Sequence, residues 1–203
     1  MARSRDGLTD EELMRRLKEG DTSAFEALAE KYLKAVVNFI YMYVRNRALA
    51  EDLTQDVFLR VLERRNQFRD EGRFAPWLYR IARNLCCDEF RKKRYSVEIS
   101  LNIRIKEEEQ QEYESLFPDR GPSPRDIVEA RNRNEFLAAA LEQLDDLSRE
   151  IIVLRHFHGL TGREVAEILG IAEGTVSSRS HRALQQLRVL LERMGFKKGD
   201  FYG

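Results

Sequence analysis

The chain has 203 residues, of which 42% are hydrophobic and 34% charged, a composition typical of one or two folded domains with a highly charged surface. Its 35 basic and 35 acidic side chains cancel, no apolar run approaches the roughly 20 residues of a membrane span, and the N-terminal residues lack the apolar core of a secretory signal. The two cysteines, Cys86 and Cys87, are adjacent and cannot form a disulfide framework, so we expect a cytoplasmic protein without membrane insertion.

Apolar residues recur at three- and four-residue intervals along most of the chain, the pattern of amphipathic helices. These stripes comprise Phe25, Leu28, Tyr32, Val36 and Phe39; Leu49, Leu53, Val57 and Val61; Leu78, Ile81, Ala82 and Leu85; Leu137, Leu141 and Leu144; and Leu184, Leu187 and Leu191. The alternation typical of a strand occurs only weakly, over residues 94–105. We therefore predict an all-α fold with two small helical domains, residues 8–94 and 125–198, joined by a flexible acidic linker over residues 95–124.

A helix expected over Ala48–Arg65 carries acidic residues opposite its apolar stripe. The outward residues, at helical spacing, are Asp52, Gln55, Asp56, Leu59 and Glu63. Carboxylates around an exposed leucine suit docking of a basic partner helix, although an ordinary solvated face has the same pattern. No histidine or metal-ligand partner is near in sequence, so we do not expect these carboxylates to be catalytic.

Basic and aromatic residues are interleaved from Phe68 to Arg94, where eight basic residues stand against four acidic ones. A glycine-containing loop leads to Phe74, Pro76 and Trp77, and a helix follows whose outward residues are Arg80, Arg83, Asn84, Cys87 and Arg91. The mixture is typical of a surface for single-stranded nucleic acid, on which bases stack and cations follow the backbone. Two alternatives stay open, because the basic residues 91–94 would also favour a helix C-terminus and a lone tryptophan is more often a core residue.

The middle of the chain has the composition of a linker. Three of the four prolines lie at Pro118, Pro122 and Pro124, where they disfavour helix. Residues 95–130 contain 4 basic and 9 acidic side chains, compared with 20 and 16 before them and 11 and 10 after them. This acidic segment either avoids a polyanion or occupies a basic channel of a partner.

A helix-turn-helix is expected near the C-terminus. Thr161 and Glu164 have the spacing of a capping box at the start of a short helix, Gly170 supplies a left-handed turn, and Ile171 fills the core before a second helix begins near Glu173. Its inner positions are Val176, Ala183, Leu184 and Leu187, and its outer residues are small, polar or basic. Residues 171–198 contain 6 basic and 2 acidic side chains, as a helix entering the DNA major groove requires.

Three segments in this order resemble the bacterial RNA polymerase sigma factors of the extracytoplasmic-function (ECF) group. They are AEDLTQDVFLRV (residues 50–61), FAPWLYRIARN (74–84) and GLTGREVAEILGIAEGTVSSRSHRAL (159–184), and the resemblance runs from about Leu8 to Met194. It implies a promoter-specificity subunit without enzymatic activity or cofactor, which binds core RNA polymerase, promoter DNA and an anti-sigma factor.

The resemblance also implies roles for individual residues. Docking on the clamp helices of core polymerase is implied for Asp52, Gln55, Asp56, Phe58, Leu59 and Glu63. Reading of the minus-ten element is implied for Phe68, Arg69, Arg73, Phe74, Trp77, Arg80, Arg83, Asn84, Arg91, Lys92, Lys93 and Arg94. Reading of the minus-thirty-five element is implied for Glu173, Gly174, Thr175, Ser177, Ser178, Arg179, His181 and Arg182.

The helix-turn-helix departs from the family pattern at two points. The second helix of the motif has Ala172 at its cap position, where the family often has Ser or Asn. Ser177 and Ser178 stand where a basic residue is common, so the base preference of the family does not transfer to this helix.

Two other functions are considered by their sequence requirements. A stand-alone helix-turn-helix regulator would not need the acidic face. A metal site built from His156, His158 and the two cysteines has no precedent in ligand spacing, so we expect no metal.

Overall fold

The computed structural model describes residues 7–69, 72–99 and 136–195, and only the backbone of residues 93–99. Every regular element in these ranges is helical, which confirms the predicted all-α fold. The chain divides into two compact units, residues 1–108 and 109–203. Most of the predicted linker lies outside the described residues.

The first unit is formed by α1 (Asp10–Lys18), α2 (Thr22–Val44), α3 (Arg47–Arg64), the 3-10 turn η1 (Arg65–Gln67) and α4 (Phe74–Ile99). Side chains cap the first three helices, because a free backbone N–H at a helix start needs an acceptor. Thr9 and Glu12 form a capping box, Asp21 accepts from the Ser23 N–H at 3.0 Å, and Asn46 accepts from the Leu49 N–H at 2.9 Å. These caps fix where each helix begins.

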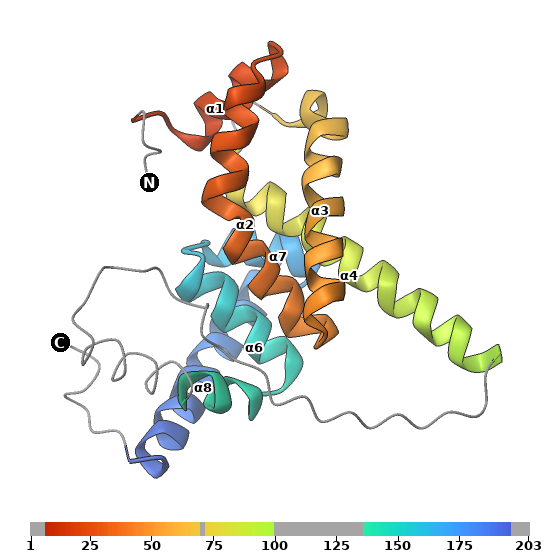
Figure 1. Cartoon of the computed structure of the whole chain (residues 1–203). Helices are drawn as coiled ribbons and strands as arrows, with labels where there is room; N and C mark the ends of the chain where they lie inside the picture. The colour runs from red at the N-terminus through yellow and green to blue at the C-terminus, as the bar shows by residue number, and fades with distance from the viewer. Residues whose placement is uncertain (1–6, 70–71, 100–135, 196–203) are drawn as a thin grey trace, which may run out of the picture. The chain divides into compact units, whose positions relative to one another are not determined.

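The core of the first unit lies between α2, α3 and α4, with α2 and α3 side by side (Figure 1). Arg45, in the left-handed region with φ of 52°, ends α2 and lets the chain reverse into α3. Val36, Val57 and Leu78 are fully buried, as the apolar spacing predicts. The Phe39 and Tyr79 rings meet edge to face with centroids 5.1 Å apart and close the core between α2 and α4.

The second unit contains a helical segment at residues 136–142, α6 (Asp146–Ile152), the π-helical turn η2 (Val153–Phe157), α7 (Gly162–Leu169) and α8 (Glu173–Arg193). One cluster of its core joins Leu141, Ile152, Ala183 and Leu187. The Arg149 side chain donates to the carbonyls of Leu141, Glu142 and Leu144 at 2.8–2.9 Å. It therefore adds donors for carbonyls at and just after the end of the 136–142 helix, where the helix supplies no further N–H.

Two details of the predicted helices are wrong. The α4 helix continues to Ile99, past the predicted boundary at Arg94, so residues 94–99 are helical and only residues 100–105 of the weak strand pattern lie outside the described residues. On α8, Leu184 is 41% exposed and Ser180 is 7% exposed. Val176, Ser180, Ala183 and Leu187 follow the three- and four-residue spacing of one face, and Leu184 lies beside that face.

Candidate polymerase and DNA interfaces

The acidic face of α3 is open to solvent along the helix. Leu59 is 56% exposed, and the polar members of the predicted set are all exposed: Asp52, Gln55, Asp56 and Glu63. The opposite side is closed, since Leu53, Val57 and Val61 are buried and Thr54 donates to the Ala50 carbonyl at 2.7 Å. The helix thus presents carboxylates and one apolar side chain on a rigid, fully packed support.

Phe58 does not belong to this face. It is 6% exposed and packs edge to face on Phe25, with ring centroids 6.2 Å apart. Its burial between α2 and α3 gives Phe58 the role of holding α3 in place.

Aromatic rings gather where the 68–74 loop meets α4. Phe68 and Phe74 are 4% and 0% exposed, and Trp77 lies against both, with ring centroids 5.4 Å and 6.2 Å away. Both phenylalanines are buried, which suits a role in supporting the loop. Trp77 is half-buried, so part of it remains exposed to solvent. The rings form a scaffold at the base of the loop.

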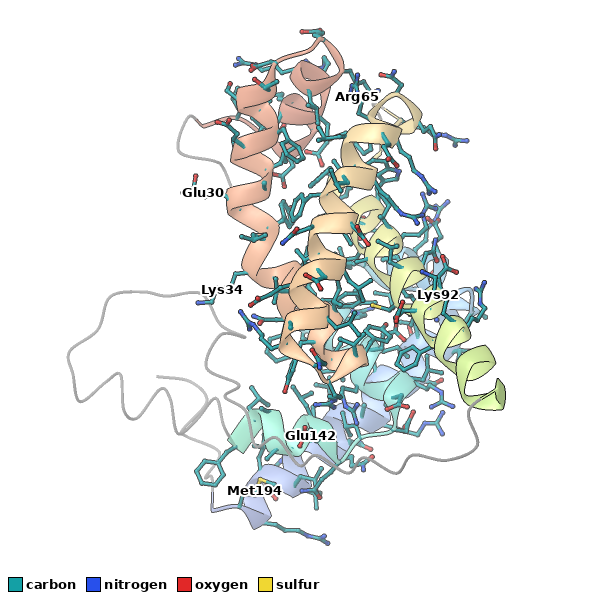
Figure 2. All side chains as sticks on the ribbon, turned by 45° about the vertical axis from the view of Figure 1, so that its right-hand side comes forward. Glu30, Lys34, Arg65, Lys92, Glu142 and Met194 are labelled. Carbon is teal, nitrogen blue, oxygen red and sulfur yellow. The ribbon has the colours of Figure 1, made fainter. Side chains whose placement is uncertain are left out.

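Exposed cations surround this scaffold and continue along α4. Arg69, Arg73, Arg80, Arg91 and Lys92 are exposed, as is Asn84, whereas Arg83 is half-buried. The side chain of Lys92, labelled on α4 in Figure 2, is 78% exposed. Because α4 ends at Ile99, the basic residues 91–94 lie more than one turn before its end, and a role at the helix C-terminus no longer accounts for them. The side chains of Lys93 and Arg94 lie outside the described residues.

Two residues that sequence reasoning missed touch both ends of the loop. Lys18 of α1 donates to the Phe68 carbonyl at 2.6 Å, and the Glu11 carboxylate accepts from the Phe74 N–H at 3.2 Å. The partners are 50 and 63 residues apart in the chain. No local spacing pattern could have revealed these contacts.

The helix-turn-helix has the predicted local geometry. Thr161 and Glu164 form a capping box, and Gly170 ends α7 in the left-handed region with φ of 68°. The N–H groups of Gly170 and Ile171 both donate to the Ala166 carbonyl, at 2.9 and 3.1 Å. The N-cap Ala172 of α8 makes no side-chain hydrogen bond, as its identity predicts.

The outer side of α8 presents small and basic side chains near its start. Glu173, Gly174, Ser177, Ser178, His181 and Arg182 are exposed, and Thr175 and Arg179 are half-buried. The hydroxyl of Ser178 donates to the Thr175 carbonyl at 3.2 Å, and Arg182 Nε donates to the Ser178 carbonyl at 3.3 Å. Short side chains at the first turns allow close approach of this helix to a groove.

Arg179 is held by an ion pair within the second unit. Its guanidinium lies 3.1 Å from the Asp145 carboxylate, which also caps α6 by accepting from the Ser148 N–H at 3.0 Å. The hydrogen bond with Ser148 and the positive charge of Arg179 hold the pKa of Asp145 below its ordinary value. One carboxylate thus fixes both a helix start and an arginine of α8.

The three histidines all lie in the second unit. Burial lowers the pKa of His158 to about 4, and burial together with Arg155 lowers the pKa of His156. His156 Nε2 lies 3.5 Å from the Ser180 hydroxyl. Within the part of the chain that the structure describes, no three His, Cys, Asp or Glu side chains are grouped as a metal site requires, and no helix there is long and apolar enough to cross a bilayer.

Comparisons with known proteins agree with both units. Residues 28–95 match the family Sigma-70 region 2, and residues 140–189 match the family Sigma-70, region 4. The chain is 31% identical to the ECF RNA polymerase sigma factor SigW of Bacillus subtilis, over 86% of this chain and 92% of that protein. The chain belongs to the ECF RNA polymerase sigma factors.

Further relatives support this assignment. The sigma factor is 34% identical to the ECF RNA polymerase sigma factor BldN of Streptomyces coelicolor over 89% of its own length, and spans 65% of that longer relative. A solved structure of the sigma factor RpoE of Bartonella quintana, in complex with the anti-sigma factor NepR, superposes with a TM-score of 0.64 at 26% identity, covering 83% of this chain and 96% of that chain.

The family assignment gives the function and separates it from the alternative. The sigma factor directs promoter-specific initiation of transcription by RNA polymerase. A stand-alone helix-turn-helix regulator is not favoured, because the region 2 match covers most of the first unit as well. That match begins at residue 28, so α1, with Glu11 and Lys18, lies before it.

Proposed function

We propose that the α3 face formed by Asp52, Gln55, Asp56, Leu59 and Glu63 docks on core RNA polymerase. The single observation that carries this assignment is the exposure of Leu59 between exposed carboxylates one turn before and one turn after it, on a helix whose other side is buried. An apolar centre contributes affinity once it is desolvated, and charges around it direct encounter with a basic partner.

The first unit reads the minus-ten element with the exposed surface around its aromatic scaffold. The contacting residues in this proposal are Arg69, Arg73, Trp77, Arg80, Arg83, Asn84, Arg91, Lys92, Lys93 and Arg94. Half-burial of Trp77 against Phe68 and Phe74 supports a fixed wall beside a base, and the cations of α4 suit a strand backbone. Phe68 and Phe74 act as its support.

The second unit reads the minus-thirty-five element with the start of α8. Small side chains at Gly174, Ser177 and Ser178 favour close approach, and Arg179 and Arg182 have the reach for guanine or phosphate. Residues Glu173, Thr175 and His181 complete the proposed surface. The absence of a side-chain cap at Ala172 leaves N–H groups at the helix start that suit a phosphate.

Promoter opening requires the polymerase as well as this chain. Separating about ten base-pair steps costs on the order of 14 kcal/mol, whereas one stacked, flipped base returns about 1–3 kcal/mol. The sigma factor therefore selects and holds a melted state that the whole enzyme stabilises. It has no catalytic role of its own, and acts in the cytoplasm, where the polymerase is.

An anti-sigma factor completes the proposed set of partners. The support is that the similar RpoE was solved in complex with one. The exposed faces of both units offer surfaces that such a partner would cover.

Competition for core polymerase tests the docking assignment. The variant carrying Asp52→Lys and Asp56→Lys should bind core polymerase at least about tenfold more weakly than the wild type in this competition, because its new positive charges repel a basic partner. Glu19→Lys, an exposed carboxylate at the end of α1, is the matched control and should compete like the wild type. Unchanged competition by the double variant, with intact binding to duplex DNA, would show that docking occurs elsewhere.

A further inference from the structure

The α1 helix is fastened firmly to α2. Leu13, Met14 and Leu17 bury its inner face. Asp10 forms an ion pair with Lys31 and accepts a hydrogen bond from the Tyr32 hydroxyl at 2.6 Å. Burial and that hydrogen bond raise the pKa of Tyr32, so the phenol stays a proton donor over the physiological range. The helix is therefore a fixed platform on the first unit.

From this platform, Lys18 holds the start of the 68–74 loop. Its ammonium donates to the Phe68 carbonyl at 2.6 Å and lies 5.6 Å from the centre of the Phe68 ring. The hydrogen bond is charge-assisted, and the cation also faces the ring. Because Phe68 is buried, this contact fixes the backbone from which Arg69 projects.

Glu11 holds the other end of the loop. Its Oε1 accepts from the N–H of Phe74, the first residue of α4. That N–H has no partner within the helix, so the Glu11 carboxylate caps the start of α4 from a distant part of the chain. The Tyr32 ring packs edge to face on Phe74 with centroids 5.3 Å apart. Because the Tyr32 hydroxyl donates to Asp10 of α1, this contact also connects α1 to Phe74.

Both ends of the loop are thus set by one helix that lies outside the matched region 2. Between these ends, Gly72 N–H donates to the Arg69 carbonyl at 2.9 Å. Arg73 precedes the capped end, and Trp77 follows it by one turn of α4. A displacement of either end would move these side chains relative to a bound strand, and small errors of position strongly reduce selectivity.

We propose that Glu11 and Lys18 are positioning residues for minus-ten recognition: α1 fixes Phe68 and Phe74, at the two ends of the reading loop, without touching DNA. This proposal rests on the proposed role of the 68–74 loop and α4 in reading that element. It gives α1 a function in base discrimination that is separate from polymerase docking.

Transcription with core polymerase and the full chain tests the proposal. A promoter selected from a library is compared with single-base variants in its minus-ten and minus-thirty-five elements. Glu11→Ala and Lys18→Met should each lower minus-ten discrimination about tenfold, as expected for loss of a charge-assisted hydrogen bond. Minus-thirty-five discrimination and competition for polymerase should stay within about twofold of the wild type, since both of those surfaces are proposed on other helices, α8 and α3.

Two matched variants sharpen this test. Glu11→Gln keeps a neutral acceptor for the Phe74 N–H, so it should retain discrimination within about threefold. Arg15→Met removes an exposed cation from the same last turn of α1 as Lys18, and it should behave like the wild type. Equal losses in Glu11→Gln and Glu11→Ala would overturn the capping role.

The same measurements distinguish the positioning role of α1 from the proposal on which it rests, that the 68–74 loop and α4 read the minus-ten element. If Trp77→Ala abolishes minus-ten discrimination while Glu11→Ala and Lys18→Met do not change it, the positioning role is wrong and the reading role stands. If Trp77→Ala also leaves discrimination unchanged, both proposals fail. A parallel loss of polymerase affinity and of minus-thirty-five discrimination would overturn the positioning role, because α1 would then hold the fold as a whole.

Discussion

The two proposed DNA-reading segments are built in different ways. The start of α8 presents side chains directly from a regular helix, and the turn before it is fixed by its neighbours Gly170 and Ile171. The 68–74 loop depends on buried rings and on partners 50 and 63 residues away. We therefore expect substitutions far along the chain to disturb the loop more than the start of α8, where Asp145 pairs with Arg179 from 34 residues away.

The largest expected effect is loss of the scaffold beneath the loop. Phe74→Ala should lower the free energy of unfolding of the first unit by about 3–5 kcal/mol, because it empties a fully buried site. Trp77 is the chain's one tryptophan, so its fluorescence during urea unfolding follows this unit.

A residue on the same helix supplies the control for that variant. Phe90 is 44% exposed, and Phe90→Ala should change the free energy of unfolding by less than about 0.5 kcal/mol. Similar losses in the two variants would contradict the buried scaffold.

Acid should destabilise the second unit before the first. The pKa of His158 is about 4 in the folded unit and near 6.5 when unfolded, so the unfolded state binds the proton first. Stability should fall as the pH drops from about 6.5 to 4, by up to about 1.4 kcal/mol per pH unit. The pKa of His156 is also lowered in the folded unit, so its protonation destabilises the unit in the same direction.

Unfolding followed by circular dichroism at several pH values measures this slope. His158→Gln should flatten it, and His181→Gln, at an exposed position on α8, should not. A first unit that loses stability over the same pH range would remove the contrast between the two units.

Removal of an α8 arginine should affect binding without affecting folding. Arg182→Ala should weaken binding to minus-thirty-five duplex DNA by about 1–3 kcal/mol, since its side chain is exposed. Arg188, farther along α8 and paired with Glu192 at 2.9 Å, is the matched control. Equal losses from Arg182→Ala and Arg188→Ala in fluorescence anisotropy would indicate a diffuse basic surface in place of a defined reader.

The smallest expected effect is a gain in affinity. Asp145→Asn keeps an N-cap acceptor for Ser148 but removes the negative charge that holds Arg179 at 3.1 Å. Duplex binding should strengthen by about 0.2–1 kcal/mol, the range of an exposed ion pair, and the gain should shrink at high salt. Weaker binding in the same anisotropy assay would show that Asp145 orients Arg179 productively.

Local patterns predicted the fold more completely than the interfaces. The α3 stripe, the capping box of α7 and the turn at Gly170 follow from spacing within a few residues, and the structure has all three. Periodicity could not tell that Phe58, Phe68 and Phe74 are buried, because their exposure depends on which other helix covers them. Glu11 and Lys18 left no local signal, since their partners lie on the far side of two helices in sequence.

The most direct test of the account is transcription from a promoter library by core polymerase with and without the purified sigma factor. The account predicts that the chain directs initiation to a small set of promoters that share two separated elements, and that the Asp52→Lys and Asp56→Lys variant loses this selectivity. Identical transcripts with and without the chain would contradict it.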